Sequence, residues 1–444
     1  MTPGAALAAQ AETVPGDAPA GRARLLADLP AAGTWRSLAE HRRRYPPPPA
    51  ISGRARRAVI AEVERAGLRG RGGAGFPTAV KLAAVAKGRG RSYVVANGAE
   101  GEPASGKDKL LLTAAPHLVL DGAQWAAAAV GASEIVVAVD RRATGALAHV
   151  ERALAERAGG PGAVPIRLVA TPPRYIAGEE SALVNWLNGG PAKPTLVPPR
   201  PFERGMNGRP TLVDNVETLA HLAQICRWGA PWFRGLGTDE EPGTALLTIS
   251  GGVERPGVYE AALGTPVGQV LSAAGAGPAS AVLVGGYFGT WIPGPSAVTT
   301  PVSRAGLQPL GAAVGCGVLA VLPEGLCGVH DSARVLNWLA AETAGQCGPC
   351  VHGLAAIAGT LSQLYHGRGG LAARDRLHRW AGMVEGRGAC RHPDGAVRFL
   401  RSALSTFDHE LAVHATTGGC SFGPLGGQRP VLPLPRAEEV PEWR

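Results

Sequence analysis

The stretch Gly67 to Pro77, with the sequence GLRGRGGAGFP, restricts the possible folds of this chain more than any other segment. Five glycines within nine residues cannot build a packed core, but they let the backbone adopt positive φ angles and approach a ligand closely. Arg69 and Arg71 add positive charge. The next segment, Thr78 to Ala86, has a helical pattern whose first N–H groups would face the same place. We therefore predict a cradle for an anionic cofactor.

A flexible linker is the alternative interpretation of this stretch. Arginine, alanine and Phe76 interrupt the Gly/Ser monotony that is typical of linkers, which favours a ligand site. The preceding segment, Arg54 to Ala66, has apolar residues at helical spacing. The stretch therefore lacks the preceding strand that a dinucleotide-binding fingerprint requires, and its meaning depends on the rest of the chain.

The composition indicates a globular protein of roughly two to four domains, since 45% of the 444 residues are apolar and 18% are charged. The net charge of +9 is scattered, without an aromatic-studded basic stripe, so nucleic acid is not an expected partner. Seven cysteines and no secretory signal favour a reduced, cytoplasmic setting. The most apolar region, Leu118 to Val139, contains Asp121, Gln124 and Glu134. We therefore expect membrane contact only through partners, with the protein cytoplasmic or peripheral on a membrane complex.

Residues 1–50 are expected to form a disordered or extended tail. Its prolines Pro46 to Pro49 would form a stiff spacer, and Arg42 to Arg44 would be a solvated arm. Residues 51–230 then alternate helical and strand-like runs, which predicts an α/β domain with a parallel sheet. The expected strands are Ser92 to Ala96, Glu134 to Val139 and Ile166 to Ala170, and the expected helices after the glycine stretch are Thr78 to Ala86, Pro116 to Val130 and Thr144 to Arg157.

Two further modules follow the α/β domain. Residues 243–310 begin with strand, turn and strand and continue with a short helix and another strand, which is typical of a small β-grasp module. Residues 328–415 have helical patterns and predict a bundle, and residues 416–444 are expected to be a tail. The expected bundle helices are Asp331 to Ala341, Gly353 to Tyr365, Leu371 to Val384 and Ala396 to Leu411.

Three polar turns lie where strands end or helices begin. Ligands of parallel sheets bind beyond the carboxyl ends of the strands, so the turns and the glycine stretch together predict one binding site. Solvated carboxylates, or carboxylates paired with helix dipoles, are the plainer interpretation of each turn alone. The turns are Asn97-Gly-Ala-Glu100-Gly-Glu102-Pro103, closed by Lys107 and Asp108; Tyr175-Ile-Ala-Gly178-Glu179-Glu180; and Asp214-Asn215-Val-Glu217-Thr218.

Cysteines late in the chain indicate a site for a soft metal. Cys347-Gly-Pro-Cys350 and Cys390 lie in loops between predicted helices, a spacing that suits thiolates converging on one metal centre. A redox-active dithiol is the rival interpretation, but it would not need Cys390. Three ligands leave one position open, which either Cys420 or His352 could fill. The remaining cysteines lie in apolar or Gly-rich runs and are expected to be buried small hydrophobes; they are Cys226, Cys316 and Cys327.

In this order, the glycine stretch, the three turns and the cysteine set resemble the flavoprotein family of respiratory complex I, which contains the NADH-binding, FMN and iron-sulfur subunit of NADH-quinone oxidoreductase. Similar subunits occur in bidirectional hydrogenases and NAD-dependent formate dehydrogenases. The resemblance covers residues 54–411. It implies an α/β FMN-binding domain, then a small soluble-ligand-binding β-grasp domain, then a C-terminal helical-bundle iron-sulfur domain.

The resemblance also implies roles for individual residues. The nicotinamide would border Phe76, Glu102 and Glu180, and no protein acid or base is needed for the hydride step. Cys347, Cys350 and Cys390 would hold the iron-sulfur cluster. The FMN pocket would be formed by Gly70, Arg71, Gly72, Gly73, Ala74, Gly75, Lys81, Asn97, Glu100, Tyr175, Gly178, Glu179, Glu180, Asn215 and Thr218.

Departures from the family pattern qualify these expectations. The family has Asn-Ala-Asp-Glu where this chain has Asn97-Gly98-Ala99-Glu100, so a carboxylate expected to meet the flavin is lost. Ala84 replaces an aromatic residue that would stack on adenine, and Val197 and Arg200 align with a Lys and a Phe, so NADH binding should be weaker by about a few kcal/mol. Ala344 replaces the first cysteine of C-x-x-C-x-x-C, so the [4Fe-4S] cluster is expected to be labile, altered or absent.

The expected function is therefore that of an FMN and iron-sulfur oxidoreductase subunit. It would pass electrons from a nicotinamide or another donor through FMN to a cluster, and on to other redox subunits or a ferredoxin-like protein. The alternative is an electron-transfer or accessory flavoprotein of the same fold that no longer binds NADH. A β-grasp ligand-binding or scaffold protein without redox cofactors is a third hypothesis.

Overall fold

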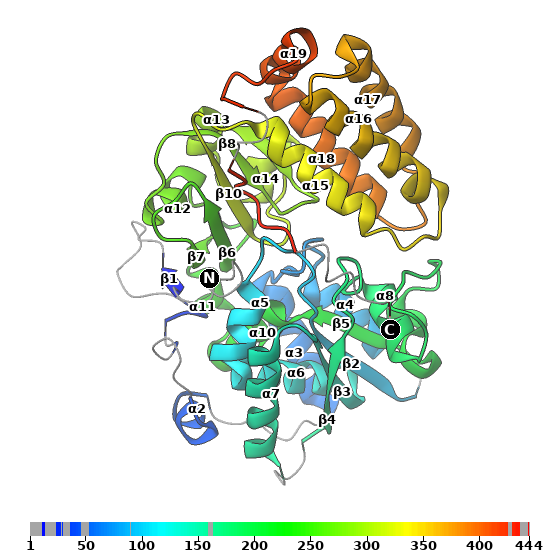
Figure 1. Ribbon diagram of the computed structural model, residues 1–444. Helices are drawn as coiled ribbons and strands as arrows, with labels where there is room; N and C mark the ends of the chain where they lie inside the picture. Colours follow the sequence, from blue (N-terminus) through cyan, green and yellow to red (C-terminus); the bar gives the residue numbers. More distant parts are fainter. Residues whose placement is uncertain are drawn as a thin grey trace.

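The computed structural model describes residues 11–13, 24–27, 29, 36–45, 53–88, 90–158, 163–424, 429–435 and 443. The molecule has three parts (Figure 1): a sheet with helices at the bottom of the view, a second sheet above it, and a helical bundle at the top. The expected spacer Pro46 to Pro49 lies outside the described residues. Among the described residues, none of the helices has both the length and the apolar character that crossing a membrane requires.

The first part contains a four-stranded parallel sheet of β2 (Ser92–Gly98), β3 (Ala132–Asp140), β4 (Ile166–Thr171) and β5 (Thr211–Asn215). The strand order is β4-β3-β2-β5, so the chain adds β3 and β4 on one side of β2 and then crosses to its other side. The helices of this part are α3 (Gly53–Ala66), α4 (Thr78–Ala86), α5 (Lys107–Ala114), α6 (Pro116–Val130), α7 (Thr144–Arg157), α8 (Glu180–Leu187), α9 (Pro201–Arg204), η1 (Met206–Gly208), α10 (Val216–Trp228) and α11 (Ala230–Arg234).

Both faces of this sheet are covered, because side chains alternate between the two faces of a strand. Val94 and Ala96 of β2 belong to the larger core, whereas Val95 lies in a smaller core on the other face. The helix α6 packs closely against α10 over the larger core. The sheet is thus held between layers, and its carboxyl edge is the part left for a ligand.

The second part is a six-stranded mixed sheet in the order β1-β7-β6-β10-β8-β9. Its predicted strand, turn and strand are present as β6 and β7, which pair antiparallel. β10 lies beyond residue 310, the expected end of this module, yet it pairs between β6 and β8 near the centre of the sheet. The elements are β1 (Ala11–Thr13), β6 (Thr244–Gly251), β7 (Gly257–Ala262), α12 (Val267–Ala273), β8 (Ala279–Val284), β9 (Thr290–Pro293), α13 (Gly294–Thr299), α14 (Arg304–Leu307), η2 (Gln308–Leu310) and β10 (Val318–Pro323).

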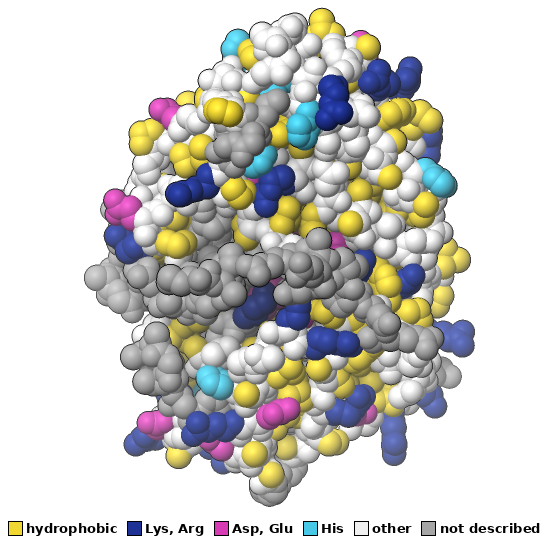
Figure 2. Space-filling model, in the orientation of Figure 1, with side chains coloured by type: hydrophobic (Ala, Val, Ile, Leu, Met, Phe, Trp, Pro, Cys, Tyr) yellow, Lys and Arg dark blue, Asp and Glu magenta, His cyan; other side chains and the backbone are white. Residues whose placement is uncertain are grey.

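The third part is the predicted helical bundle, whose helices share one apolar core. Its predicted third helix, Leu371 to Val384, begins one residue earlier, and the fourth, Ala396 to Leu411, is divided in two near Phe407. On the face shown in Figure 2, Lys and Arg side chains are interspersed with apolar and uncharged groups. The elements are α15 (Gly328–Ala341), η3 (Pro349–Leu354), α16 (Ala355–Tyr365), α17 (Gly370–Val384), α18 (His392–Thr406) and α19 (Asp408–Thr417).

Part of the N-terminal segment is ordered, which corrects the expectation of a disordered or extended tail for the residues described. The helix α2 (Leu38–Arg44) begins with a capping box between Ser37 and Glu40. Its buried His41 contacts Asp121 of α6, with 2.7 Å between Nε2 and Oδ2. The basic residues Arg42 to Arg44 are exposed. The tertiary contact of His41 anchors a helix that its basic sequence alone does not suggest.

The N-terminal segment also reaches the second sheet. The backbone N–H groups of Arg24, Leu25 and Leu26 donate to the carboxylate of Glu260 on β7, at 2.9–3.0 Å. β1 pairs in parallel with the same strand. The segment before the α/β domain is thus attached to β7 in two places.

The C-terminal segment is likewise docked in the parts described. The N–H groups of Val431 and Leu432 donate to Asp331 in the first turn of α15, and the Leu432 side chain is buried. Farther on, the Trp443 carbonyl accepts a 2.8 Å hydrogen bond from Ala192, close to α8 (Figure 1). The expected tail thus crosses back from the bundle to the first part of the molecule.

Candidate functional site

The candidate site lies at the carboxyl ends of β2 and β5. These strands are neighbours, and their final polar residues Asn97 and Asn215 are directly paired in register. The chain changes sides between β4 and β5, and such a switch point in an open α/β sheet is where ligands bind. The predicted strand-end turns are therefore brought together by the sheet topology.

The glycine stretch forms a loop over this edge. Gly73 and Gly75 have φ angles of 112° and 60°, which residues other than glycine rarely adopt. A Cβ on Gly72 would lie 3.2 Å from the Cβ of Asn215, so the loop backbone packs directly on the end of β5. Gly72, Gly73 and Ala74 are exposed, and the Phe76 side chain is 53% exposed. The loop therefore presents its backbone and an aromatic ring outward.

Arg71 is fixed at the base of this loop. Its backbone N–H donates to Oγ1 of Thr218 at 2.9 Å, and its Nε lies 3.9 Å from Oε1 of Glu217. Burial lowers the pKa of the guanidinium. Its buried Nε and Nη2 atoms make no hydrogen bond with the described residues. Donors left in this state are costly unless they bind a partner, so the site is arranged for an anion.

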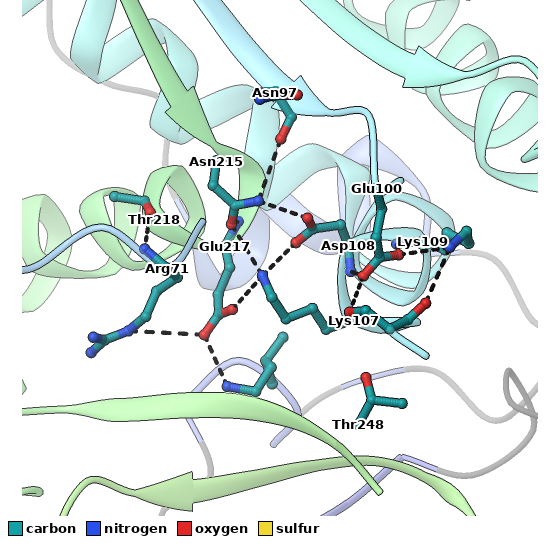
Figure 3. Close-up of polar contacts among 12 residues, drawn as sticks. Arg71, Asn97, Glu100, Lys107, Asp108, Lys109, Asn215, Glu217, Thr218 and Thr248 are labelled. Atoms are coloured by element: carbon teal, nitrogen blue, oxygen red, sulfur yellow. Dashed lines mark hydrogen bonds and ion pairs between the residues drawn. The ribbon is translucent and has the colours of Figure 1, made fainter. Parts of the chain in front are cut away.

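A buried ion cluster lies beside Arg71 (Figure 3). Nζ of Lys107 lies 2.8 Å from a carboxylate oxygen of both Asp108 and Glu217, and 3.2 Å from Oδ1 of Asn215. Burial alone would raise the pKa of Glu217, but Lys107 lowers it to about 2. The pKa of Asp108 is raised to about 6, chiefly by burial. These charges are satisfied within the protein and hold the site in shape.

From the sequence, no individual role was assigned to three residues of this cluster, although all three stand in the predicted turns: Lys107, Asp108 and Glu217. Lys107 and Asp108 begin α5, and Glu217 lies in the first turn of α10. The Glu217 carboxylate also accepts a 2.9 Å hydrogen bond from the Leu246 N–H of β6. One feature of the sequence could have indicated this cluster. A lysine and an aspartate stand side by side at the start of a helix, in a turn that follows a strand.

The turn that begins at Asn97 and the turn that begins at Tyr175 contact each other. Nδ2 of Asn97 donates to the Gly178 carbonyl at 2.8 Å. A Cβ on Gly178 would lie 2.4 Å from the carbonyl oxygen of Ala99, so glycine is required at this crossing. Ala99, which stands where the family has a carboxylate, thus lies in the contact between the turns.

Glu100 points into the protein. Its carboxylate accepts hydrogen bonds from Oγ of Ser105 at 2.5 Å and from Nζ of Lys109 at 3.1 Å. Burial alone would raise the pKa of Glu100, but Lys109 and Lys107 hold it below its ordinary value. Glu179 likewise caps its own helix, since Oε2 accepts from the N–H groups of Ser181 and Ala182. In the structure both carboxylates bind their own turns.

Lys81 of α4 reaches the edge between β5 and α8. Its Nζ donates to the Val213 carbonyl and lies 3.5 Å from Oε1 of Glu180 and 3.7 Å from Oδ1 of Asp214. Burial raises the pKa of Asp214 to about 6. Glu180 Oε1 and Asp214 Oδ2 are buried without a hydrogen bond to the described residues. Together with Arg71, these atoms leave both donors and acceptors for a polar ligand.

Glu102 and Tyr175 connect the site to the other two parts of the molecule. Oε2 of Glu102 accepts from the Tyr287 N–H at 2.8 Å and from the Tyr175 hydroxyl at 3.1 Å. Burial raises the pKa of Glu102 to about 7. The Tyr175 ring packs edge-on against Phe288 and Trp338, with centroids 4.7 and 4.9 Å apart. The turn before α8 thus touches the second sheet and the bundle together.

Two of the three predicted metal ligands, Cys347 and Cys390, lie in loops of the bundle, and Cys350 lies in η3. Burial raises the pKa of Cys350 to about 12, and its thiol is within hydrogen-bonding reach of Cys347 and in the electrostatic field of Cys390. Burial likewise raises the pKa of Cys390, and Glu179 lies near enough to add to this shift. Ala344, at the position of the family's first cysteine, is buried. Among the described residues these three thiols do not form a group whose ligand atoms all lie within 4.8 Å of one another, so their sulfur atoms are near neighbours without the close spacing of a formed metal site.

Of the two proposed fourth ligands, Cys420 is placed in a different group of side chains. Cys420 lies instead beside Cys327 and His414, so the expectation that it could complete the set is wrong for this structure. His352 is exposed on η3. Cys327 is buried as expected, and Cys226 and Cys316 are partly buried. Ala84 is half-buried on α4, and Val197 and Arg200 are exposed before α9.

Three segments of the chain match known protein families. Residues 63–224 match the Nuo51 FMN-binding domain, and residues 246–284 match the SLBB domain. Residues 331–414 match the NADH-ubiquinone oxidoreductase-F iron-sulfur binding region. These segments fall in the first sheet, the second sheet and the bundle, respectively.

The chain is also similar along most of its length to individual proteins. The F 2 subunit of NADH-quinone oxidoreductase from Rhizobium meliloti (strain 1021) is 31% identical over 90% of this chain and 96% of the relative. The F subunit of NADH-quinone oxidoreductase from Streptomyces coelicolor is 34% identical over 82% of this chain and 85% of the relative. A solved chain of NAD+-reducing [NiFe]-hydrogenase in the H2-reduced state has a TM-score of 0.76 and 32% identity, over 81% of this chain and 63% of that chain.

Proposed function

The chain belongs to the family of the F subunit of NADH-quinone oxidoreductase, and we propose that it works as an FMN and iron-sulfur subunit within a larger redox complex. In this proposal it takes electrons from NADH and passes them through FMN to a cluster in the helical bundle. Partner redox subunits receive the electrons.

The observation that carries the FMN assignment is the state of Arg71. Its buried guanidinium lies 3.9 Å from Glu217, yet its Nε and Nη2 atoms make no hydrogen bond with the described residues, and the glycine loop that carries it is exposed; this is the chemistry that binds a phosphate. Lys81 adds a second cation across the site. We propose that the phosphate and ring of FMN are held by Gly70, Arg71, Gly72, Gly73, Ala74, Gly75, Phe76, Lys81, Asn97, Tyr175, Gly178, Glu180, Asn215 and Thr218, with Glu100 and Glu179 supporting the turns.

FMN supplies the conversion between hydride transfer and single-electron transfer when it is bound. The protein's contribution is position and charge. The exposed ring of Phe76 offers an apolar surface that a nicotinamide would cover. Glu102, with its pKa raised to about 7 by burial, is close to half protonated at neutral pH and therefore carries less negative charge than an exposed glutamate. Glu180 borders the same region through its contact with Lys81.

We assign the cluster to Cys347, Cys350 and Cys390. The Cys350 thiol is within hydrogen-bonding reach of Cys347 and close enough to Cys390 for their charges to interact, and soft thiolates are the ligands that iron-sulfur centres use. The methyl group of Ala344 supplies no fourth ligand, so we propose a labile or altered [4Fe-4S] site. Tyr175 lies between Glu102 and the bundle, and Glu179 lies near Cys390. The turn before α8 therefore touches both sites.

The electron donor can be tested by stopped-flow spectroscopy of anaerobic, FMN-loaded protein. We expect NADH to bleach the flavin absorbance, and electrons to reach the cluster afterwards. NADPH and a reduced ferredoxin are the comparison donors. Bleaching by ferredoxin but not by NADH would favour the accessory flavoprotein, in agreement with the replacements at Ala84, Val197 and Arg200. Protein that binds no FMN would contradict both functions.

A further inference from the structure

A second cluster of metal-binding side chains lies in the bundle, apart from the three thiols assigned to iron and sulfur. Cys327, His414 and Cys420 each offer one ligand atom, and these atoms all lie within 4.8 Å of one another. Cys327 and His414 are buried, and Cys420 is half-buried. In this set, the Cys327 cluster, Cys327 stands 87 residues before His414 in the chain, so the fold brings it to the other two.

The spacing within the Cys327 cluster suits a tetrahedral metal ion. Bond lengths of about 2.3 Å for Zn–S and about 2.0 Å for Zn–N place neighbouring ligand atoms roughly 3.5 to 3.8 Å apart. Sγ of Cys327 lies 3.4 Å from Nε2 of His414, and the Cys420 thiol is within hydrogen-bonding reach of Cys327. The Cys327–His414 distance thus matches one edge of a zinc tetrahedron, and the third ligand atom lies within 4.8 Å of both.

The Cys327 cluster and the iron-sulfur ligands lie at opposite ends of α15. Cys327 is the residue just before the helix, whereas Cys347 and Cys350 follow its end. A helix of 14 residues is roughly 20 Å long. No single ion or cluster can use both sets.

We propose that Cys327, His414 and Cys420 bind one Zn²⁺ ion, which clamps the end of α19 to the start of α15. Two thiolates and an imidazole favour zinc over hard cations such as Mg²⁺. The carboxylate of Glu410, which accepts from the Gly328 N–H at 2.9 Å, and water are the available fourth ligands. The Tyr365 ring packs beside His414, with centroids 5.3 Å apart, and limits the rotation of the imidazole.

The clamp would act where the chain leaves the bundle. Cys420 follows the end of α19, and the chain then returns so that Val431 and Leu432 bind Asp331, one turn into α15 from Cys327. A metal bond at Cys420 would fix the chain to the bundle shortly before the second attachment, which Val431 and Leu432 make to Asp331. The zinc ion would therefore have a structural role and take no part in electron transfer.

The proposal is tested on the full chain, prepared anaerobically with reductant and saturated with zinc. We expect one zinc ion per chain by elemental analysis, with two sulfur neighbours and at least one nitrogen neighbour by X-ray absorption at the zinc edge. Cys420→Ser should lose this zinc while it keeps iron and FMN. Cys350→Ser should show the reverse loss, and Cys226→Ser should keep both metals.

Replacement of Cys420 is the preferred variant because its side chain is only half-buried, and retained FMN binding would show that the variant is folded. Zinc content unchanged in Cys420→Ser would overturn the proposal. So would a Cys327–Cys420 disulfide, mapped by mass spectrometry, in protein that was saturated with zinc under reductant.

Discussion

The two redox sites of this protein are built in different ways. The flavin site is held by groups from the glycine loop, two strand ends and two helices, and Lys107 binds them through buried ion pairs. The proposed iron-sulfur ligands are three thiols, of which Cys347 and Cys390 lie in loops and Cys350 lies in η3, and burial raises the pKa of Cys350 and Cys390. Backbone topology alone can therefore place the first site, whereas the second depends on the identity of each side chain. One alanine, Ala344, changes the second site without disturbing the fold around it.

The largest expected effect is the loss of the cluster when one thiol is removed. Cys350→Ser should abolish the iron-sulfur EPR signal of the reduced protein, because only three thiolates are available. FMN binding should be unchanged if the two sites are independently built. Iron and sulfide analysis with flavin titration checks both statements, with Cys226→Ser as the control. Loss of FMN together with the cluster would show that the two sites are not independent.

Removal of Lys107 should be the most damaging change at the flavin site. Lys107→Met leaves Asp108 and Glu217 buried and facing one another without their cation, which should cost about 3–5 kcal/mol of stability. Urea unfolding followed by tryptophan fluorescence measures the loss. Lys109→Met is the matched control, because this lysine is 41% exposed and its pair with Glu100 should contribute only about 1 kcal/mol. Equal losses in the two variants would contradict the role of Lys107.

Sequence patterns predicted the elements around the flavin site closely. The helices Thr78–Ala86, Pro116–Val130 and Thr144–Arg157 begin and end where their apolar spacing does, and Pro116 marks a first turn. The glycine loop was also recognisable, because arginine, alanine and Phe76 interrupt its glycines in a way that is not typical of a flexible linker. Local patterns suffice when the interactions that fix an element lie within it.

Pairings between distant residues could not be predicted in this way. Nothing local indicates that Lys107 meets Glu217, or that Cys327 meets Cys420. The helix Leu38–Arg44 was missed for the same reason, because His41 is anchored by Asp121 of another helix. Such contacts depend on how the elements pack, and the sequence of each element alone does not contain that information.

The pH dependence of stability can test the burial of Glu102, which connects the first part of the molecule to the second sheet through Tyr287. Its pKa is raised from 4.5 to about 7, chiefly by burial, so the folded state binds more protons than the unfolded state between these values. Stability should therefore fall by about 3 kcal/mol as the pH rises from 4.5 to 7, and the penalty persists above that range. Glu102→Gln cannot titrate and should lack this part of the profile. Parallel stability profiles for the two proteins would show that Glu102 ionises freely.

Arg71 should give the smallest of these effects, confined to ligand binding. Arg71→Gln removes a charged donor and should weaken FMN binding by about 2 kcal/mol, or about 30-fold. Quenching of FMN fluorescence on titration measures the affinity. Arg65→Gln is the control, since this side chain is 67% exposed on α3 and pairs only with its neighbour Glu62 among the described residues. Unchanged affinity in Arg71→Gln would remove the main support for a phosphate at this position.

The attachment of residues 11–13 and 24–26 to β7 bears on self-association. β1 occupies one edge of the six-stranded sheet, and the N–H groups of Arg24, Leu25 and Leu26 satisfy the buried Glu260. A shortened chain that begins after these residues would expose a row of unpaired backbone groups on β7 and leave a buried carboxylate without these donors. Open strand edges pair readily with other chains. We therefore expect an expression variant that omits this segment to be less soluble than the full chain.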